Sequence, residues 1–584
     1  MKGTRKLLGL LAVAASSASL LAVQAAIAQD NSIDNLTPVT DEMLIDPPDG
    51  DWLMWRRTYD GWGYSPLEEI NRDNVGDLQL AWAWGMSPGG RSQETPLVHD
   101  GILYLQNSTH LIQALDGATG ELIWEYEYEL PEGVNPSGQR SKAIYEDKLI
   151  IATRDAHLLA LDAKTGQLIW DKQVANSDYG YSFSSGPIVA NGVVVQGMTG
   201  CGGGQPGGCF ITGHDVETGE EMWRVNTIAR GDSPEGNSWN GLPVESRHGG
   251  SAWISGSYDP EQNLIFAGVG QPYPWVAEIS GLLPESSEDG VTNDALYTNS
   301  TLAIDPQTGN LEWYHQYLPN DSLDLDYAYE RMLIDLPFDG DDRQMLVTTG
   351  KLGIIEAIDR VSGEWLWAQE TVPQNVVASI DEETGEKTIN PETIPRIGET
   401  TFNCPADPGG RAWQATAYSP RTQMLYLPTV EFCSNTTPNP LDPGEIYTGG
   451  GMATFARVPH PDGDGNIGQV RAIDMTDQSE AWQYRQRPPV TSSTLPTGGG
   501  VVFVGSLDRK FLALDDETGE VLWSSGSLSN SLESFPISYE ADGKQYVAVV
   551  ANWASGLGRL ASLTPDIRLP PDNPATLYVF ALPD

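Results

Sequence analysis

The segment LALDAKTGQLIW (159–170) carries the pattern that decides the fold: an apolar residue, an aspartate, a turn ending in glycine, and a short strand closing on tryptophan. The Asp side chain can cap such a turn and the glycine supplies a positive φ, so the segment predicts a hairpin between two strands. The same pattern recurs along the chain. Its clearest other copies are QALDGATGELIW (113–124), TGHDVETGEEMW (212–223), LAIDPQTGNLEW (302–313), EAIDRVSGEWLW (356–367) and LALDDETGEVLW (512–523).

Two weaker copies, RAIDMTDQSEAW (471–482) and NRDNVGDLQLAW (71–82), complete the set. Most copies lie 41 to 54 residues apart, which fits one four-stranded blade per repeat. The sequence therefore predicts an all-β fold, an eight-bladed β-propeller in which each terminal tryptophan packs between neighbouring blades. The C-terminal TLYVFAL (576–582) has no repeat of its own, and we expect it to complete the first blade. The predicted docking residues are Trp82, Trp124, Trp170, Trp223, Trp313, Trp367, Trp482 and Trp523.

The first 28 residues are typical of a secretory signal peptide. A basic start is followed by an apolar run over Leu7–Val23 and by a small-residue A-x-A site that ends at Ala28. A membrane anchor is the alternative, but serines interrupt the run. We therefore expect cleavage after Ala28, a periplasmic protein without a membrane anchor, and one propeller domain over 29–584.

The formal net charge is −47, which excludes nucleic acid as a partner. The acidity suits solubility in a salty habitat, and it also suits steering of a basic partner such as a cytochrome. Charge alone leaves both interpretations open.

Four cysteines in an exported chain suggest disulfide bonds, and their order suggests Cys201–Cys209 and Cys404–Cys433. No C-x-x-C-H motif occurs, so the chain is not expected to carry a covalent c-type haem.

Taken together, the repeats and several segments resemble the pyrroloquinoline quinone (PQQ) dehydrogenases, a family of eight-bladed propellers that includes methanol and ethanol dehydrogenases. The resemblance covers nearly all of the chain after residue 28 and is closest to the soluble sorbose/sorbosone-type enzymes. It implies oxidation of an alcohol, polyol or sugar hydroxyl to a carbonyl, with PQQ as hydride acceptor and a periplasmic cytochrome c taking the electrons. The segments that carry it are YSPLEEINRDNVGDLQLAW (64–82), TPLVHDGILYL (95–105), GCFITGHDVETGEEMWR (208–224), LPNDSLDLDY (318–327) and GGRAW (409–413).

The resemblance also implies a cofactor site. Trp253, in GGSAWISGSYD (249–259), matches the residue that stacks under the cofactor ring, and Ser251 matches a residue that bonds to its edge. Lys351 stands where the family has a basic residue at the quinone oxygens. A flat tricarboxylate needs such an aromatic floor and such cations. The remaining matched cofactor residues are Arg140, Thr153 and Ser185.

The segment LDLDYAYE (323–330) matches the catalytic region. Asp324 aligns with the family's aspartate general base, and Asp326 aligns with the extra acid of lanthanide-using members. Together with Gln271, which stands in place of a family asparagine, these residues imply a site for Ca²⁺ or a lanthanide. Glu330 is a further acid that could share the pocket. A solvated acidic loop is the alternative interpretation.

Three features depart from the family pattern and argue against simple methanol oxidation. The metal-binding glutamate expected near 199–202 is absent, and the adjacent-cysteine disulfide is replaced by Asn-Pro-Ser-Gly at 135–138. An early cofactor-binding glutamate falls on Gln93 or Glu94. A different class of function remains open: a non-enzymatic propeller that acts in envelope assembly or binding, which would lack the constellation of cofactor residues. Aromatic candidates for the substrate wall are Trp239, Tyr273, Trp275 and Trp553.

Overall fold

The structure is a computed structural model of the chain. It describes residues 36–87, 92–202, 207–231, 234–283, 290–338, 340–440, 452–552, 557–570 and 573–584. The predicted signal peptide and Trp553 lie outside these residues. Within them, no helix has both the length and the apolar character needed to cross a membrane.

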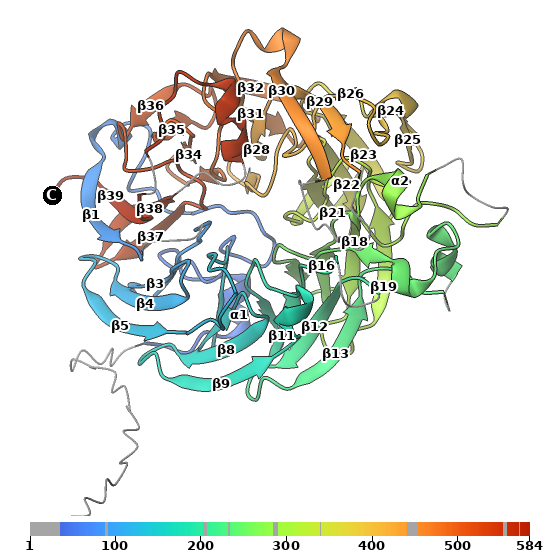
Figure 1. The fold of residues 1–584 in the computed structure, drawn as a ribbon. Coiled ribbons are helices and arrows are strands. Elements are labelled where there is room, and N and C mark those ends of the chain that lie inside the picture. The colour runs from blue at the N-terminus through green and yellow to red at the C-terminus, as the bar shows by residue number, and fades with distance from the viewer. Residues whose placement is uncertain are drawn as a thin grey trace, which may run out of the picture.

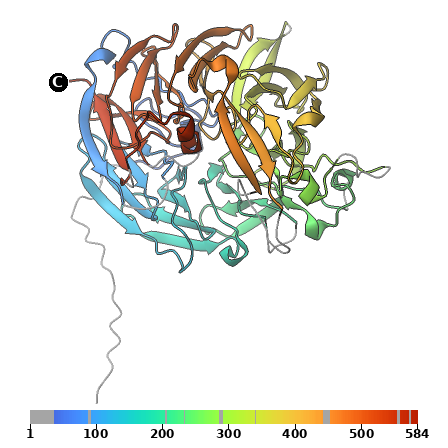
Figure 2. The same ribbon diagram turned by 45° about the horizontal axis from the view of Figure 1, so that its top comes forward.

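The described strands form eight four-stranded antiparallel sheets, set around a central axis (Figures 1 and 2). The prediction of an all-β fold is confirmed. The first two sheets in chain order are β2 (Leu97–His99), β3 (Ile102–Gln106), β4 (Leu111–Asp116) and β5 (Leu122–Glu127), and then β6 (Ala143–Tyr145), β7 (Lys148–Ala152), β8 (His157–Asp162) and β9 (Leu168–Gln173). The third sheet is β10 (Ile188–Ala190), β11 (Val193–Gly197), β12 (Phe210–Asp215) and β13 (Glu221–Asn226). The fourth sheet is β15 (Ser257–Asp259), β16 (Leu264–Gly268), β18 (Ser300–Ile304) and β19 (Leu311–Gln316).

The other four sheets follow in chain order, except that the last one combines both ends of the described chain. They are β20 (Met332–Phe338), β21 (Asp341–Thr349), β22 (Ile354–Asp359) and β23 (Trp365–Glu370); β27 (Ala417–Ser419), β28 (Met424–Val430), β31 (Gly468–Asp474) and β32 (Glu480–Gln486); β33 (Leu495–Pro496), β34 (Val501–Gly505), β35 (Phe511–Asp515) and β36 (Val521–Ser524); and β37 (Ile537–Ala541), β38 (Lys544–Ala551), β39 (Thr576–Ala581) and β1 (Gln79–Gly85).

The repeat tryptophans connect one sheet to the next, as the sequence predicts. The indole of Trp124 donates a 3.0 Å hydrogen bond to the carbonyl of Ala163, in the turn between β8 and β9 of the next sheet. Asp162 caps that turn by accepting from the backbone and hydroxyl of Thr165. Gly166 closes the turn with φ 70°, and a Cβ there would lie 2.5 Å from the Trp124 ring. The glycine is therefore required both by the turn and by the docked indole.

The same contact recurs around the molecule. Five other indoles donate to a carbonyl of a neighbouring sheet or of the segment before it: Trp82 to Gly117, Trp170 to Val216, Trp223 to Pro306, Trp482 to Asp516, and Trp523 to Leu78. The C-terminal strand β39 pairs with β1, as predicted for TLYVFAL. This pairing joins the two ends of the described chain in one sheet (Figure 1).

Shorter elements lie outside the eight sheets. The helices α1 (Asp41–Ile45) and α2 (Ala277–Ser280) are brief. A three-stranded sheet of β26 (Thr401–Asn403), β29 (Phe432–Pro438) and β30 (Ala453–Pro459) belongs to the longest insertion between repeats. Two small two-stranded sheets pair β14 (His248–Gly249) with β17 (Pro272–Tyr273), and β24 (Val377–Ile380) with β25 (Lys387–Ile389).

Candidate active site

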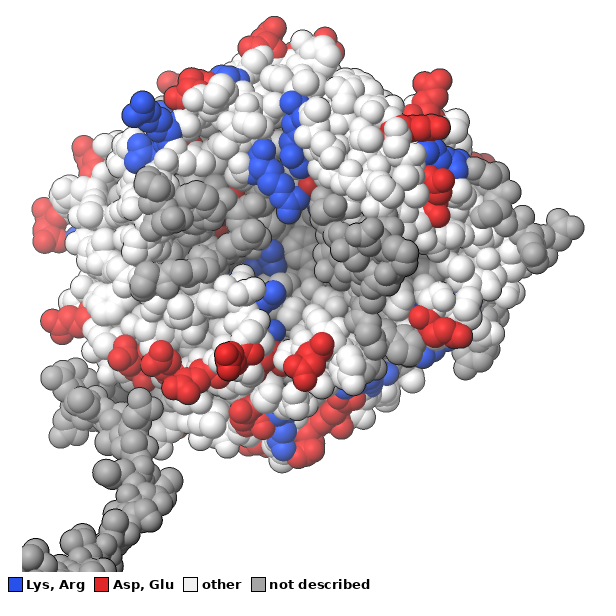
Figure 3. Space-filling model, in the orientation of Figure 1, with Lys and Arg blue, Asp and Glu red and all other residues white. Residues whose placement is uncertain are grey.

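Loops from several sheets converge on one cavity of about 270 Å³. Its aromatic wall contains Trp253, Tyr329 and Trp413, and its acidic group is Asp407. Its cations are Arg140, Arg154, Lys351 and Arg559. In Figure 3, Lys and Arg side chains gather along a central hollow, whereas Asp and Glu lie mainly toward the rim of that face. In a protein of net charge −47, such a concentration of cations points to an anionic ligand.

Aromatic and cationic groups are interleaved in this cavity. The guanidinium of Arg140 lies 4.8 Å from the ring centroid of Trp253 and 5.6 Å from that of Trp413. Tyr329 meets the Trp253 ring edge to face, with centroids 5.3 Å apart. The predicted stacking residue Trp253 therefore lines the cavity with one cation, the Arg140 guanidinium, over its ring.

Lys351 is the centre of a buried polar cluster at one end of the cavity. Its Nζ lies 2.7 Å from Asp324 Oδ1, 2.8 Å from the Asp324 carbonyl and 2.8 Å from Asp326 Oδ2. The sequence predicted all three residues for the site, and the structure brings them together. The backbone of Asp324 has φ 63°, a left-handed conformation that is uncommon for a non-glycine residue and often found at functional sites.

Gln271 completes this cluster. Its Nε2 donates to Asp324 Oδ1 at 2.6 Å, and its backbone N–H donates to Asp326 Oδ1 at 3.3 Å. Its Oε1 is buried and has no hydrogen-bond partner among the described residues. The preceding Gly270 allows this close approach, because a Cβ there would lie 2.4 Å from Asp326 Oδ1. An oxygen acceptor without a donor is therefore buried within the group of carboxylates.

Burial and the close opposite charges together set the ionisation of this cluster. Burial raises the pKa of Asp324 well above its ordinary value, against the opposing effect of Lys351 and with the help of the Asp326 charge. For Lys351, burial acts to lower the pKa, but the Asp324 and Asp326 carboxylates outweigh it and raise the pKa. The lysine is therefore held as an ammonium, and Asp324 is a carboxylate that accepts a proton more readily than an exposed one.

The Cys201–Cys209 disulfide, predicted from the sequence, lies beside this cluster. Cys209 Sγ is 3.6 Å from Ser251 Oγ, and the Ser251 carbonyl accepts a hydrogen bond from Gly270 N–H. Ser251 thus lies between the disulfide and the turn that carries Gln271. Cys201 of this disulfide lies in the segment 199–202, where the family's metal-binding glutamate was expected but is absent.

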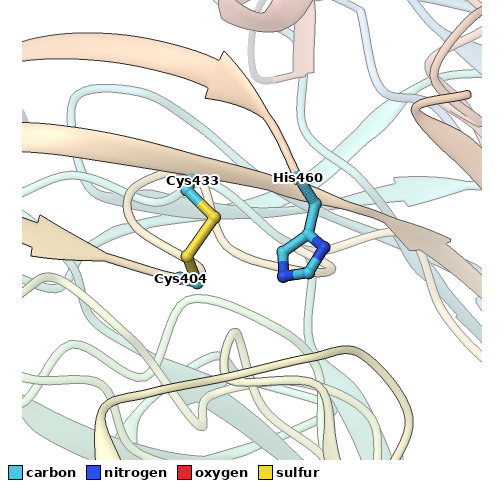
Figure 4. Close-up of side chains that lie close together, drawn as sticks. All are labelled: Cys404, Cys433 and His460. Atoms are coloured by element: carbon cyan, nitrogen blue, oxygen red, sulfur yellow. A yellow bond between two sulfur atoms is a disulfide. The ribbon is translucent and has the colours of Figure 1, made fainter. Parts of the chain in front are cut away.

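The second predicted disulfide, Cys404–Cys433, is also present. It lies beside His460 (Figure 4), and because its sulfurs are bonded to each other they are not available as thiolate ligands. It anchors the start of the loop that brings Asp407 into the cavity. The Asp407 carboxylate pairs with Arg457 at 3.1 Å and with Arg559 at 2.5 Å.

Thr153 and Ser185 lie next to cavity residues rather than in the cavity wall. The Thr153 hydroxyl donates to Asp155 at 2.5 Å, whereas the adjacent Arg154 lines the cavity. The Ser185 hydroxyl bonds to Ser141 and Ser255, whereas Ser184 lines the cavity. The early cofactor-binding glutamate of the family was expected at Gln93 or Glu94. Gln93 lines the cavity, whereas Glu94 forms a buried ion pair with Lys142.

Other predicted acids and aromatics have structural partners. Glu330 forms a bidentate ion pair with Arg411, at 2.8 and 2.7 Å. Trp239 is buried and donates to the Leu296 carbonyl, and Trp275 is buried against Phe455. Tyr273 is half-buried, and burial followed by the charges of Asp326 and Asp324 raises its pKa. It is therefore the aromatic candidate that lies near the cluster.

Sequence reasoning did not assign a role to several residues of the cavity wall, among them Arg154, Tyr329, Asp407 and Arg559. These four lie outside the repeat, three of them in loops and Arg559 in the 3-10 helix Leu557–Leu563. Trp413 was quoted only as part of a family segment. A signal existed for Asp407, which lies between two prolines near a paired cysteine, but its partners Arg457 and Arg559 are 50 and 152 residues away.

Comparison with known proteins identifies the family. The family model described as glucose/ethanol/alcohol dehydrogenase, beta-propeller domain, matches residues 52–396 and 464–547. The chain therefore belongs to the PQQ-dependent alcohol dehydrogenase family, and it is a quinoprotein oxidoreductase with a propeller fold. This agrees with the resemblance drawn from the sequence.

Individual relatives agree with this assignment. The chain is 32% identical to the quinohemoprotein alcohol dehydrogenase ADH-IIG of Pseudomonas putida over 548 residues, which covers 89% of this chain and 74% of that protein. It is 29% identical to the quinoprotein alcohol dehydrogenase PedH of Pseudomonas putida, with 93% of each chain covered. Among solved structures, a europium-containing methanol dehydrogenase superposes with a TM-score of 0.80 at 27% identity, covering 93% of this chain and all of that one.

The residue types of the cavity wall fit PQQ. A flat tricarboxylate requires an aromatic surface and several cations, and the cavity offers Trp253 together with Arg140, Arg154 and Lys351. The polar cluster fits a hard cation, because Asp324, Asp326 and the buried, unpartnered Gln271 Oε1 are all oxygen donors.

Proposed function

We propose that Asp324 is the general base of an alcohol, polyol or sugar dehydrogenase whose cofactor binds in the cavity above Trp253. The observation that carries the proposal is the buried contact between Asp324 and Lys351, because Lys351 also lines the cavity with the aromatic and cationic wall. When bound, PQQ supplies an electrophilic quinone carbonyl that accepts a hydride. Asp324 takes the hydroxyl proton of the substrate onto its carboxylate, for which its raised pKa suits it.

Other side chains position these groups. Lys351 positions Asp324 by donating one hydrogen bond to its carboxylate and one to its backbone carbonyl. Trp253 provides the stacking surface, and Arg140 provides a cation for a cofactor carboxylate. Ser251 supports the edge of the site. Thr153 and Ser185 stay predictions, each supported by an immediate neighbour in the cavity wall.

Asp324, Asp326 and Gln271 are the proposed ligands of Ca²⁺ or a lanthanide. Support comes from their common burial and from the Gln271 Oε1 that lacks a donor. A hard cation held there would polarise an adjacent carbonyl oxygen.

The remaining proposals concern the whole chain. Each four-stranded sheet is one blade, so the propeller has eight, and residues 29–584 form a single domain after signal cleavage at Ala28. The protein acts in the periplasm without a membrane anchor and passes electrons to a cytochrome c. The signal-like start and the two disulfides support this location.

The test is reconstitution of the purified, cofactor-free protein with PQQ and either Ca²⁺ or La³⁺. Dye reduction with alcohols, polyols and sugars should follow uptake of the cofactor, which is measured by its absorbance. Asp324→Asn should bind PQQ but lose at least about 10²-fold in kcat. Asp342→Asn, an exposed acid on β21, should behave as wild type. Full turnover of the Asp324 variant, or no cofactor uptake under any metal, would refute the proposal.

A further inference from the structure

The formal charge of the polar cluster can be read from its contacts. Two carboxylates, Asp324 and Asp326, share one ammonium, because Lys351 Nζ lies 2.7 and 2.8 Å from them. Gln271, the third proposed ligand, is neutral. Among the described residues, Lys351 forms ion pairs with these two carboxylates. With both carboxylates ionised, as metal ligands must be, the side chains of the site carry a net charge of −1.

The chain offers no further carboxylate from the segment where one was expected. Residues 199–202 are Thr-Gly-Cys-Gly, and Cys201 is bonded to Cys209. The nearby Asp407 is paired with Arg457 and Arg559. Asp326 therefore offsets the charge of Lys351 instead of adding an uncompensated charge to the site.

We propose that this cation site is matched to a divalent ion such as Ca²⁺, although Asp326 stands where lanthanide-using relatives carry their extra acid. The inference rests on the proposed function, since it concerns the cation of that site. One carboxylate of a bound tricarboxylate cofactor facing this cation would bring the total to −2, which a divalent ion would neutralise. A trivalent ion leaves a buried positive charge, which is costly where the dielectric constant is low.

Charge, rather than ligand identity, is the variable to test, and the chain offers two independent ways to change it. Gln271→Glu adds one carboxylate with almost no change in shape. Lys351→Met removes the ammonium and substitutes none of the proposed ligands. Both variants take the site from −1 to −2, and both should favour a trivalent ion.

The experiment measures binding of Ca²⁺ and La³⁺ by calorimetry to the full-length mature protein with PQQ present. Competition against Tb³⁺ luminescence, excited through nearby tryptophan, gives an independent readout that needs no turnover. We expect Gln271→Glu and Lys351→Met each to raise the ratio of La³⁺ to Ca²⁺ affinity about tenfold or more over wild type. Asp342→Asn should leave the ratio unchanged. Melting temperatures check that the variants fold. If Lys351→Met does not fold, the isosteric Gln271→Glu alone is enough to test the proposal.

The outcomes separate the two levels of inference. A ratio that stays constant or falls in Gln271→Glu overturns the charge-matching proposal while leaving the dehydrogenase assignment intact. Absence of both PQQ and metal binding in the wild-type protein refutes the proposed function itself.

Discussion

The guanidinium of Arg140 lies 4.8 Å from the ring centroid of Trp253, on the surface where the cofactor is proposed to stack. Its Nη1 donates to the Ser184 carbonyl at 2.9 Å, which fixes its direction. The stacking surface is thus covered by a cation until the cofactor arrives, and binding has to exchange a cation–π contact for a ring stack and an ion pair.

Substitution of Trp253 should therefore weaken the binding of PQQ more than replacement of the Arg140 guanidinium by the ammonium of lysine does. We expect Trp253→Ala to raise the Kd for PQQ by about 10- to 100-fold, from the loss of stacking area. Arg140→Lys keeps the charge and should cost less than Arg140→Gln. Quenching of tryptophan fluorescence during a PQQ titration provides the measurement. Equal affinity of the wild type and of Trp253→Ala for PQQ would show that the cofactor does not stack on Trp253.

The Glu94–Lys142 pair makes a prediction for stability. Both side chains are fully buried; burial raises the pKa of Glu94 to about 7 and lowers that of Lys142. Lys142→Met alone leaves a buried carboxylate and should cost about 3–5 kcal/mol of the free energy of unfolding. The double variant Glu94→Leu/Lys142→Met should recover most of that loss. Chemical denaturation measures both, and additive losses would contradict the pairing.

The His99 ring makes a prediction for pH dependence. Its Nδ1 lies 2.7 Å from Asp51 Oδ2 and its Nε2 lies 2.7 Å from the Thr37 carbonyl, with Asp100 at 3.5 Å. Burial acts to lower the pKa of His99, but Asp51, the Thr37 carbonyl and Asp100 outweigh it and raise the pKa. The imidazolium therefore stabilises the fold fully below about pH 6.5, and this contribution is lost as pH rises through the higher folded-state pKa.

Denaturation of wild type and His99→Gln between pH 5.5 and 9 measures this contribution. The stability advantage of the wild type should shrink as pH rises. An advantage that is constant across this range would show that the imidazolium is not the stabilising form.

The two disulfides should differ in their effect. In the chain-entropy picture, a longer closed loop gives more stabilisation, so removal of Cys404–Cys433 should cost about 3.5 kcal/mol and removal of Cys201–Cys209 about 2.5 kcal/mol. Their sequence separations are 29 and 8 residues. Paired Cys→Ser variants compared by melting temperature test the order. The reverse order would mean that local packing, not loop closure, decides the effect.

The docked tryptophans predict a sharp difference between two glycines. Gly166→Ala should destabilise the protein by about 2–5 kcal/mol, because φ is 70° and a Cβ would lie 2.5 Å from Trp124. Gly465 has φ 79° with open space around it, so Gly465→Ala should cost only the backbone strain, about 1–2 kcal/mol. Similar losses in both variants would argue against the tight contact between turn and indole.

Local chemistry explains which parts of the fold the sequence predicted. An Asp-capped turn and a docking tryptophan act within a few residues, so the pattern at 159–170 predicted its hairpin and its partner sheet. The strand at 576–582 was predicted because an unpaired apolar strand at the chain end needs a neighbour. The boundaries of the long insertions could not be predicted, since they depend on packing against distant loops.

The site shows the same division. Trp253, Lys351 and Arg140 were predicted by resemblance and line one cavity, and Asp324, which was also predicted, contacts Lys351 at 2.7 Å. Arg559 and Asp407 were not predicted, because their ion pair joins segments that lie 152 residues apart, which no local pattern records. Thr153 and Ser185 are each one residue from a wall residue, and in extended chain one residue reverses the direction of the side chain.

Since β1 completes its sheet only by pairing with β39, the first strand of the propeller has to wait for the last. A ribosome must synthesise almost the whole polypeptide before that sheet can close. Until then the edge of β39's sheet and the apolar face of β1 remain open, so a stalled or truncated chain is a target for chaperones and proteases.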